Sequence, residues 1–253
     1  MEDKFRLNIL DRAMRKKILD ILLAIFVCYS VTAQDREASS SVVDEHAIIP
    51  TSEDYLILGT FSDYMEYYGI DTANCEVDHY DYHIEKLAYY IHSLLTARYG
   101  DNVKMKKIPN RYYIYSCRQS EILSLLYRQS NNLSDNNFPD RESALSYMHG
   151  VYLRFSQPQD DTLHCISVYN SRHGRLFYKI ASSFGFTNLN IEELNTIPHT
   201  TKVYFTPTEE FLEFVQPTAE LKRKLQIDYE KMLRKRLGIS ARKMKALKKK
   251  YGN

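Results

Sequence analysis

Apolar and polar residues recur along this chain with two different periods, and the change of period separates predicted helices from predicted strands. The clearest helical stripe runs from about Asp81 to Tyr99, where apolar residues recur at every third or fourth position and Gly100 stands at the expected stop. The same spacing predicts further helices that begin near Ser120, Asp140, Gly174, Pro207 and Thr218.

Short runs between these helices predict strands. One antiparallel hairpin is expected to join residues 103–107 to 111–116, and a second to join Val151–Phe155 to residues 163–169. Single strands are expected at Tyr55–Leu58 and at residues 202–205. Since no regular βαβ unit is visible, the pattern predicts an α+β fold, with several helices packed on short antiparallel hairpins and a basic helical C-terminal extension. The sequence shows no internal repeat.

The first 33 residues carry the three parts of a secretory signal peptide. A basic start at residues 15–17 precedes an apolar middle at residues 21–27, and Val31-Thr32-Ala33 matches a cleavage site between Ala33 and Gln34. A membrane anchor, a lipoprotein built on Cys28 and a buried helix are the alternatives. The signal predicts an exported protein of the periplasm, cell envelope or secreted space.

The signal also sets the predicted boundaries. Met14 gives a more compact signal than Met1, so we expect translation to start at Met14. The segments are expected to be residues 1–33 as signal peptide, 34–50 as flexible linker, 51–217 as globular domain and 218–253 as basic helical extension.

The amino-acid composition narrows the range of functions to be considered. The chain has 21 tyrosines, no tryptophan and eight glycines. Few glycines argue against a phosphate-cradling nucleotide site, whereas tyrosines suit exposed binding surfaces. No cofactor is predicted.

The C-terminal extension is strongly basic. Residues 220–253 hold 13 Lys and Arg against three Asp and Glu, on a mildly acidic body. Such a helix suits an anionic membrane surface or an acidic protein partner, and the alternative is a solvated terminus. Nucleic acid attracts the same charge, but export disfavours it. The candidate residues are Arg234, Lys235, Arg236, Arg242, Lys243, Lys245, Lys248, Lys249 and Lys250.

A cluster of acids and histidines is the candidate metal site. His79 and His83 are four residues apart and would share a helical face, with Asp78 completing the shell. The zinc-protease spacing needs Glu directly after the first His, however, and Tyr80 stands there. In the alternative interpretation this segment is a helix start at which Asp78 serves as a capping residue.

The cysteines offer a second candidate chemistry. Cys75, Cys117 and Cys165 follow the signal, and export permits one disulfide and one free thiol among them, although their spacing does not choose the pair. Three buried thiols are the alternative, and we favour them slightly. Cys165 is a candidate nucleophile with His173 as its base, against the alternative of a core cysteine beside a solvated turn.

The sequence therefore favours a non-enzymatic exported binding protein. One alternative is a hydrolase that uses the metal or cysteine candidates. The second alternative is a nucleic-acid binder that acts through the basic extension, which requires the signal peptide to be wrong.

Overall fold

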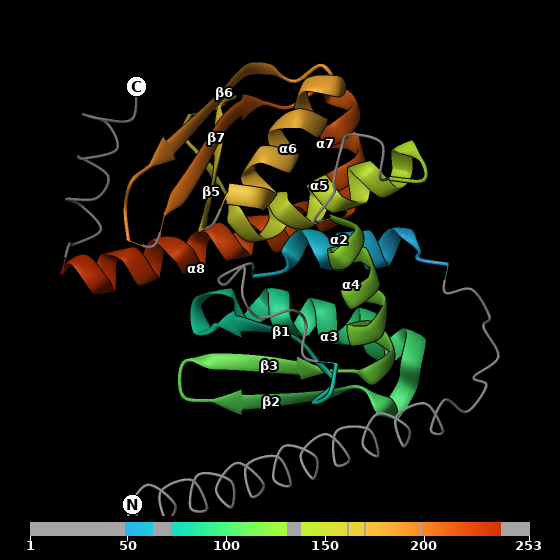
Figure 1. Ribbon diagram of the computed structural model, residues 1–253. Coiled ribbons are helices and arrows are strands. Elements are labelled where there is room, and N and C mark those ends of the chain that lie inside the picture. The colour runs from blue at the N-terminus through green and yellow to red at the C-terminus, as the bar shows by residue number, and fades with distance from the viewer. Residues whose placement is uncertain are drawn as a thin grey trace, which may run out of the picture. The chain divides into compact units, whose positions relative to one another are not determined.

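The computed structural model describes residues 49–62, 72–130, 138–160, 162–169, 171–197 and 199–238. These residues form helices and two small antiparallel sheets (Figure 1), so the predicted α+β fold is confirmed. Several predicted features lie outside the described residues: the signal peptide at 1–33 with its cleavage site at Ala33 and Gln34, the start at Met14, and the basic residues 242–250.

The first half of the described chain contains a three-stranded sheet, sheet A, with strand order β1-β3-β2. Helix α3 packs on one face of sheet A, where Tyr80, Tyr112 and Ile114 meet the apolar stripe of the helix. The elements are α2 (Ser52–Thr60), β1 (Glu76–Asp81), the short helix η1 (Tyr82–Ile84), α3 (Glu85–Tyr99), η2 (Gly100–Asn102), β2 (Lys104–Ile108), β3 (Arg111–Tyr115) and α4 (Cys117–Ser130).

The second half contains sheet B, with strand order β4-β5-β7-β6. Helix α6 packs on it over Ile166, Val203 and Phe205, which are buried. The elements are α5 (Arg141–Phe155), β4 (Ser156–Pro158), β5 (His164–Tyr169), α6 (Ser171–Ser183), β6 (Thr187–Leu194), β7 (Thr200–Thr206), α7 (Glu209–Val215), η3 (Gln216–Thr218) and α8 (Ala219–Leu237).

The two halves repeat one arrangement that the sequence did not reveal. Apart from the short strand β4, which follows α5 and pairs with β5, each half runs helix, strand, helix, hairpin, helix, and β1-β3-β2 in sheet A corresponds to β5-β7-β6 in sheet B. Helix α2 then corresponds to α5, α3 to α6 and α4 to α7. The repeat is one of topology, because the residues that build it differ.

Helices α2 and α5 cross at two glycines. A Cβ on Gly59 would lie 2.1 Å from the backbone oxygen of Tyr147, and a Cβ on Gly150 would lie 2.0 Å from that of Leu56. The contacts are reciprocal: on each helix, the carbonyl that approaches the partner's glycine belongs to the residue three positions before that helix's own glycine. Only hydrogen as a side chain allows this approach, so the crossing fixes both glycines.

Two sequence predictions are wrong because this crossing is buried. Tyr55–Leu58 is helix rather than strand, since α2 is buried on nearly every side and shows no stripe. Val151–Phe155 continues α5 instead of forming a hairpin strand, for the same reason. Both helical interpretations of the segment from Asp78 to His83 are wrong because of strand pairing: residues 76–81, including His79, form β1 and pair with β3.

Cys75 and Cys117 form a disulfide that joins the residue before β1 to the first residue of α4, whereas Cys165 is free and buried. The domain boundary at residue 218 stays a prediction; α8 begins one residue later and buries Lys222 and Leu225. None of the helices in the described ranges is long and apolar enough to span a membrane.

Candidate functional site

The face of sheet A that points away from α3 carries basic and aromatic side chains. Because side chains alternate along a strand, every second residue of β2 and β3 points to this side, and so do their partners on β1, where an irregularity between Glu76 and Asp78 shifts the alternation by one residue. We call this surface the outer face of sheet A: Glu76, His79 and Asp81 on β1, Lys104, Lys106 and Ile108 on β2, and Arg111, Tyr113 and Tyr115 on β3.

Three aromatic rings stack in series on this face, from β1 to β3 and then along β3. The His79 and Tyr113 rings stack with centroids 5.6 Å apart, and Tyr113 and Tyr115 stack at 6.4 Å. Partial burial lowers the pKa of His79, so its ring is neutral near neutral pH. The positive charge of this face therefore comes from Lys104, Lys106 and Arg111 rather than from the histidine.

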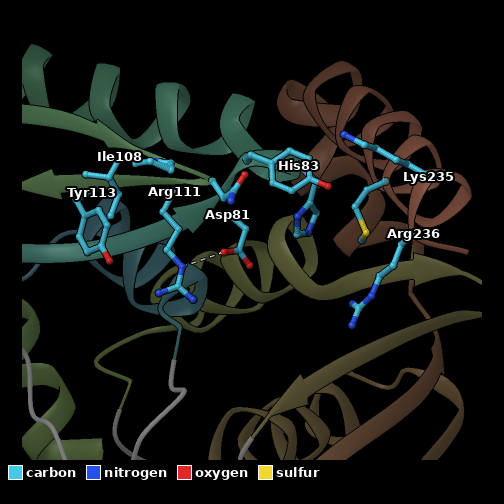
Figure 2. Close-up of a pocket in the computed structure, with 11 residues that line it drawn as sticks. Asp81, His83, Ile108, Arg111, Tyr113, Lys235 and Arg236 are labelled. Carbon is cyan, nitrogen blue, oxygen red and sulfur yellow. Dashed lines mark hydrogen bonds and ion pairs between the residues drawn. The ribbon is translucent and has the colours of Figure 1, made fainter.

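The outer face ends in a groove. This groove, called here the basic groove, lies between the β2–β3 turn, η1 and the last turns of α8, and has a volume of about 770 Å³. Figure 2 shows Arg111 and Arg236 directed to the same side of the groove, with His83 between them. Its lining residues are Asp81–His83, Ile108–Arg111, Tyr113, Met232, Lys235 and Arg236.

The groove carries more positive than negative charge. Arg111 forms an ion pair with Asp81 at 3.3 Å, and Tyr113 followed by Asp81 raises the pKa of this guanidinium. Asp81 is the acid among the lining residues, whereas Arg111, Lys235 and Arg236 are cations. Within the described part of the chain, neither Lys235 nor Arg236 has an ion-pair partner. Burial lowers the pKa of His83, which adds no charge near neutral pH.

A buried ion pair holds β1 in place beside the ends of α2 and α5. Arg154, in the last turn of α5, pairs with Asp78 and donates to the Thr60 carbonyl and, at 2.8 Å, to the His79 carbonyl. Asp78 also accepts hydrogen bonds from the backbone and hydroxyl of Ser62 at 3.1 and 2.8 Å. Breaking such a pair leaves a buried charge alone, so this network fixes where the outer face begins.

Helix α8 is anchored at both ends of its buried side. The Lys222 ammonium donates to three backbone carbonyls at the end of α5, those of Tyr152, Leu153 and Ser156 at 2.5 to 3.3 Å. Further along, Lys86 of α3 pairs with Asp228, and the His83 and Tyr229 rings lie 6.1 Å apart. These contacts bring Lys235 and Arg236 to the groove.

The candidate metal residues serve different purposes in the structure. Asp78 is bound to Arg154, His79 stacks on Tyr113, and His83 lines the basic groove. No group of three or more His, Cys, Asp or Glu among the described residues is placed to hold a metal ion.

The candidate pair of Cys165 and His173 lies on opposite sides of sheet B. Cys165 alternates with the inward residues Ile166 and Val168, and burial raises the pKa of its thiol to about 11. His173, on α6, is hydrogen-bonded through Nδ1 to the Tyr147 hydroxyl at 2.7 Å. The structure does not bring the two side chains together.

Sequence reasoning found Lys235 and Arg236 but missed their companions. The missed residues lie on the β2–β3 hairpin, which forms at about the place that the sequence predicts. They are Lys104, Lys106, Arg111 and Tyr113. The alternation of Lys and Tyr in that hairpin was the available signal, but only the strand register shows that they share a face.

Similarity to known proteins is found in structure alone. No protein-family model matches the chain, and no curated protein matches it in sequence. A structure of I-DmoI in complex with DNA and Ca has a TM-score of 0.44 at 11% identity, covering 66% of this chain and 88% of that one. The N-terminal LAGLIDADG domain of DUF199/WhiA has a TM-score of 0.39 at 14% identity, covering 69% and 90%. Full-length DUF199/WhiA from Thermatoga maritima has a TM-score of 0.39 at 12% identity, covering 74% and 63%.

These neighbours correct the predicted function. They include a homing endonuclease solved on DNA, and they conflict with an exported binding protein, with the signal-peptide, secreted and periplasmic descriptions, and with nucleic acid as a disfavoured partner. The nucleic-acid alternative is closer to these neighbours. Likeness at this level carries no argument about this chain's chemistry, which depends on its own residues.

Proposed function

We propose that this protein binds nucleic acid through the outer face of sheet A and the basic groove. The observation that carries the proposal is the convergence of Arg111 from the β2–β3 hairpin with Lys235 and Arg236 from α8, more than 100 residues later in the chain. Packing brings these cations to one hollow, in which Asp81 is the acidic side chain.

The distribution of charge suits a phosphate backbone. Lys104 and Lys106 extend the positive surface along β2 beyond the groove, and the Tyr113 and Tyr115 hydroxyls lie in the neighbouring row. Lys, Arg and Tyr side chains are the groups that contact phosphate oxygens, and these contacts supply most of the sequence-independent affinity. That I-DmoI is seen in complex with DNA is consistent with this proposal.

The test is binding of labelled oligonucleotides to the full chain, followed by fluorescence anisotropy over a series of salt concentrations. A phosphate-binding surface predicts that the logarithm of the association constant falls linearly with the logarithm of salt concentration. The double variant Lys235→Gln, Arg236→Gln is expected to weaken binding and to lower the slope by about 2, because each phosphate contact contributes about 1.

The matched control removes the same charge from the same helix. Arg223 and Lys224 are paired with Glu220 on an exposed part of α8, away from the groove. Arg223→Gln with Lys224→Gln is expected to leave the slope near that of the wild type. Absence of binding to every single- and double-stranded probe at low salt would reject the proposal, and equal losses in the two double variants would remove the groove from it.

A further inference from the structure

The basic groove carries an exposed aromatic side chain beside its cations. Tyr82 lies on η1 and is 45% exposed, although it is a large aromatic residue. Its ring meets the His83 ring edge to face at 5.7 Å, and Tyr113 lines the groove as well. An exposed tyrosine next to arginines is the arrangement on which unpaired bases stack.

The size of the groove separates single strands from duplexes. A volume of about 770 Å³ lies within the range of small-molecule sites, so it has room for a nucleotide but not for a double helix. In a duplex the bases are stacked inside and only the phosphates reach the protein. An unpaired strand can place a base in a hollow and its phosphates on the rim.

The cations lie where such phosphates would be. Arg111 and Arg236 stand on either side of His83 (Figure 2), and the Arg111 side chain is 49% exposed despite its ion pair with Asp81. The neutral His83 ring between them offers an apolar surface together with a hydrogen-bonding nitrogen. The groove therefore combines aromatic side chains with three cations.

We propose that the basic groove binds an unpaired nucleotide of a single-stranded or locally opened nucleic acid, with the base stacked on Tyr82 and the flanking phosphates on Arg111, Lys235 and Arg236. This rests on the proposed function and goes beyond it by naming the substrate class as unpaired strand. Arg111 and the α8 cations position the strand, and Tyr82 discriminates it from a duplex.

The experiment measures anisotropy of the full chain with three probes of equal length: an oligothymidylate, its oligouridylate counterpart, and a blunt duplex. Both single strands are expected to bind about tenfold more tightly than the duplex. Comparing the oligothymidylate with the oligouridylate shows separately whether the protein distinguishes deoxyribose from ribose. Tyr82→Ala is expected to weaken binding of the single strands about tenfold and to leave the duplex unchanged, whereas Tyr82→Phe keeps the wild-type preference.

The control is Tyr89→Ala, which removes a tyrosine of similar exposure from α3 outside the groove. Thermal unfolding checks that each variant is folded, which is expected because both side chains are exposed. Equal binding of duplex and single strand, or an equal loss for both in Tyr82→Ala, would refute the preference for an unpaired strand but not the proposal of nucleic-acid binding. If no probe binds, the proposed function itself fails.

Discussion

Sheets A and B share strand order and a covering helix, yet their outer faces differ in charge. The outer face of sheet A carries three cations, Lys104, Lys106 and Arg111, beside Glu76 and Asp81, whereas on sheet B Lys202 lies opposite Glu192 of the neighbouring strand. Tyr204 of sheet B donates to Glu192 at 3.4 Å, so its hydroxyl is engaged within the sheet. Inner faces must pack on a helix, but outer faces are free of that requirement and can take up different chemistry.

The two halves also differ in how their central helices end. In the first half, the carbonyl of Thr60 at the end of α2 accepts a hydrogen bond from Arg154, which forms an ion pair with the buried carboxylate of Asp78. In the second half, Lys222 donates hydrogen bonds to the carbonyls at the end of α5, and burial lowers the pKa of this amine to about 7. The C-terminal end of α2 is therefore capped by a residue in an ion pair, whereas that of α5 is capped by an amine that has no carboxylate partner among the residues that the structure describes.

The largest effect is expected where the halves meet. Gly150→Ala would place a Cβ 2.0 Å from the Leu56 carbonyl, which must force α2 and α5 apart. We expect a loss of about 3 kcal/mol or more in the free energy of unfolding, measured by urea denaturation. Gly185→Ala is the control: it has positive φ but no atom within 4 Å, and should lose only about 1 kcal/mol. Equal losses in the two variants would contradict a tight crossing.

The next effect separates the two helix ends. Arg154→Met should destabilise the protein by about 3–5 kcal/mol, because it leaves the Asp78 carboxylate buried without its partner. Lys222→Met removes one donor from three carbonyls, of which that of Tyr152 keeps the Ser156 N–H, and leaves no buried charge, so it should lose about 1–3 kcal/mol. Adding Asp78→Asn to Arg154→Met is expected to recover part of the loss. The order of the two single variants is the readout, and a reversed order would refute the assignment of the larger penalty to the ion pair.

The two halves should also differ in how their stability depends on pH, because the residue before the crossing glycine is a histidine on α5 and a leucine on α2. His149 precedes Gly150 on α5, and burial lowers its pKa to about 4, whereas the matched residue before Gly59 is Leu58. The unfolded chain takes up a proton near pH 6.5 and the fold does not until about pH 4, so stability should fall by roughly 3 kcal/mol as pH drops through that window.

The variant His149→Leu copies the first half and should make this fall smaller. The His149 Nε2 atom is hydrogen-bonded to the Thr218 hydroxyl at 2.6 Å, and in the variant this hydroxyl keeps its hydrogen bond to the Val215 carbonyl at 3.0 Å. Denaturation midpoints of both proteins at pH 7, 5.5 and 4.5 give the comparison. Parallel curves would show that His149 does not contribute.

The smallest effect tests the outer faces directly. Lys106→Gln on sheet A should lower the salt slope of oligonucleotide binding by about 1, and Lys202→Gln on sheet B should leave it unchanged. Both changes remove one positive charge, so a general effect of net charge would lower both slopes alike and would contradict the assignment to sheet A.

Elements with a clear period could be predicted from the order of residues alone. The helix ending at Tyr99, the hairpin around Pro109 and the long C-terminal helix ending before Gly238 follow from apolar stripes, turn residues and a glycine stop, all of which act within a few residues. The α+β class follows from their order. Lys235 and Arg236 were recognised because local charge density is visible in a sequence.

Contacts between distant segments set the remaining features. Helices α2 and α5 are buried on nearly every side, so they lack the stripe that marks a helix, and their glycines acquire meaning only from the partner helix. The outer face of sheet A depends on strand register, and the groove depends on α8 returning beside the hairpin. Long-range packing has no local pattern, and this is why the site could not be recognised along the chain.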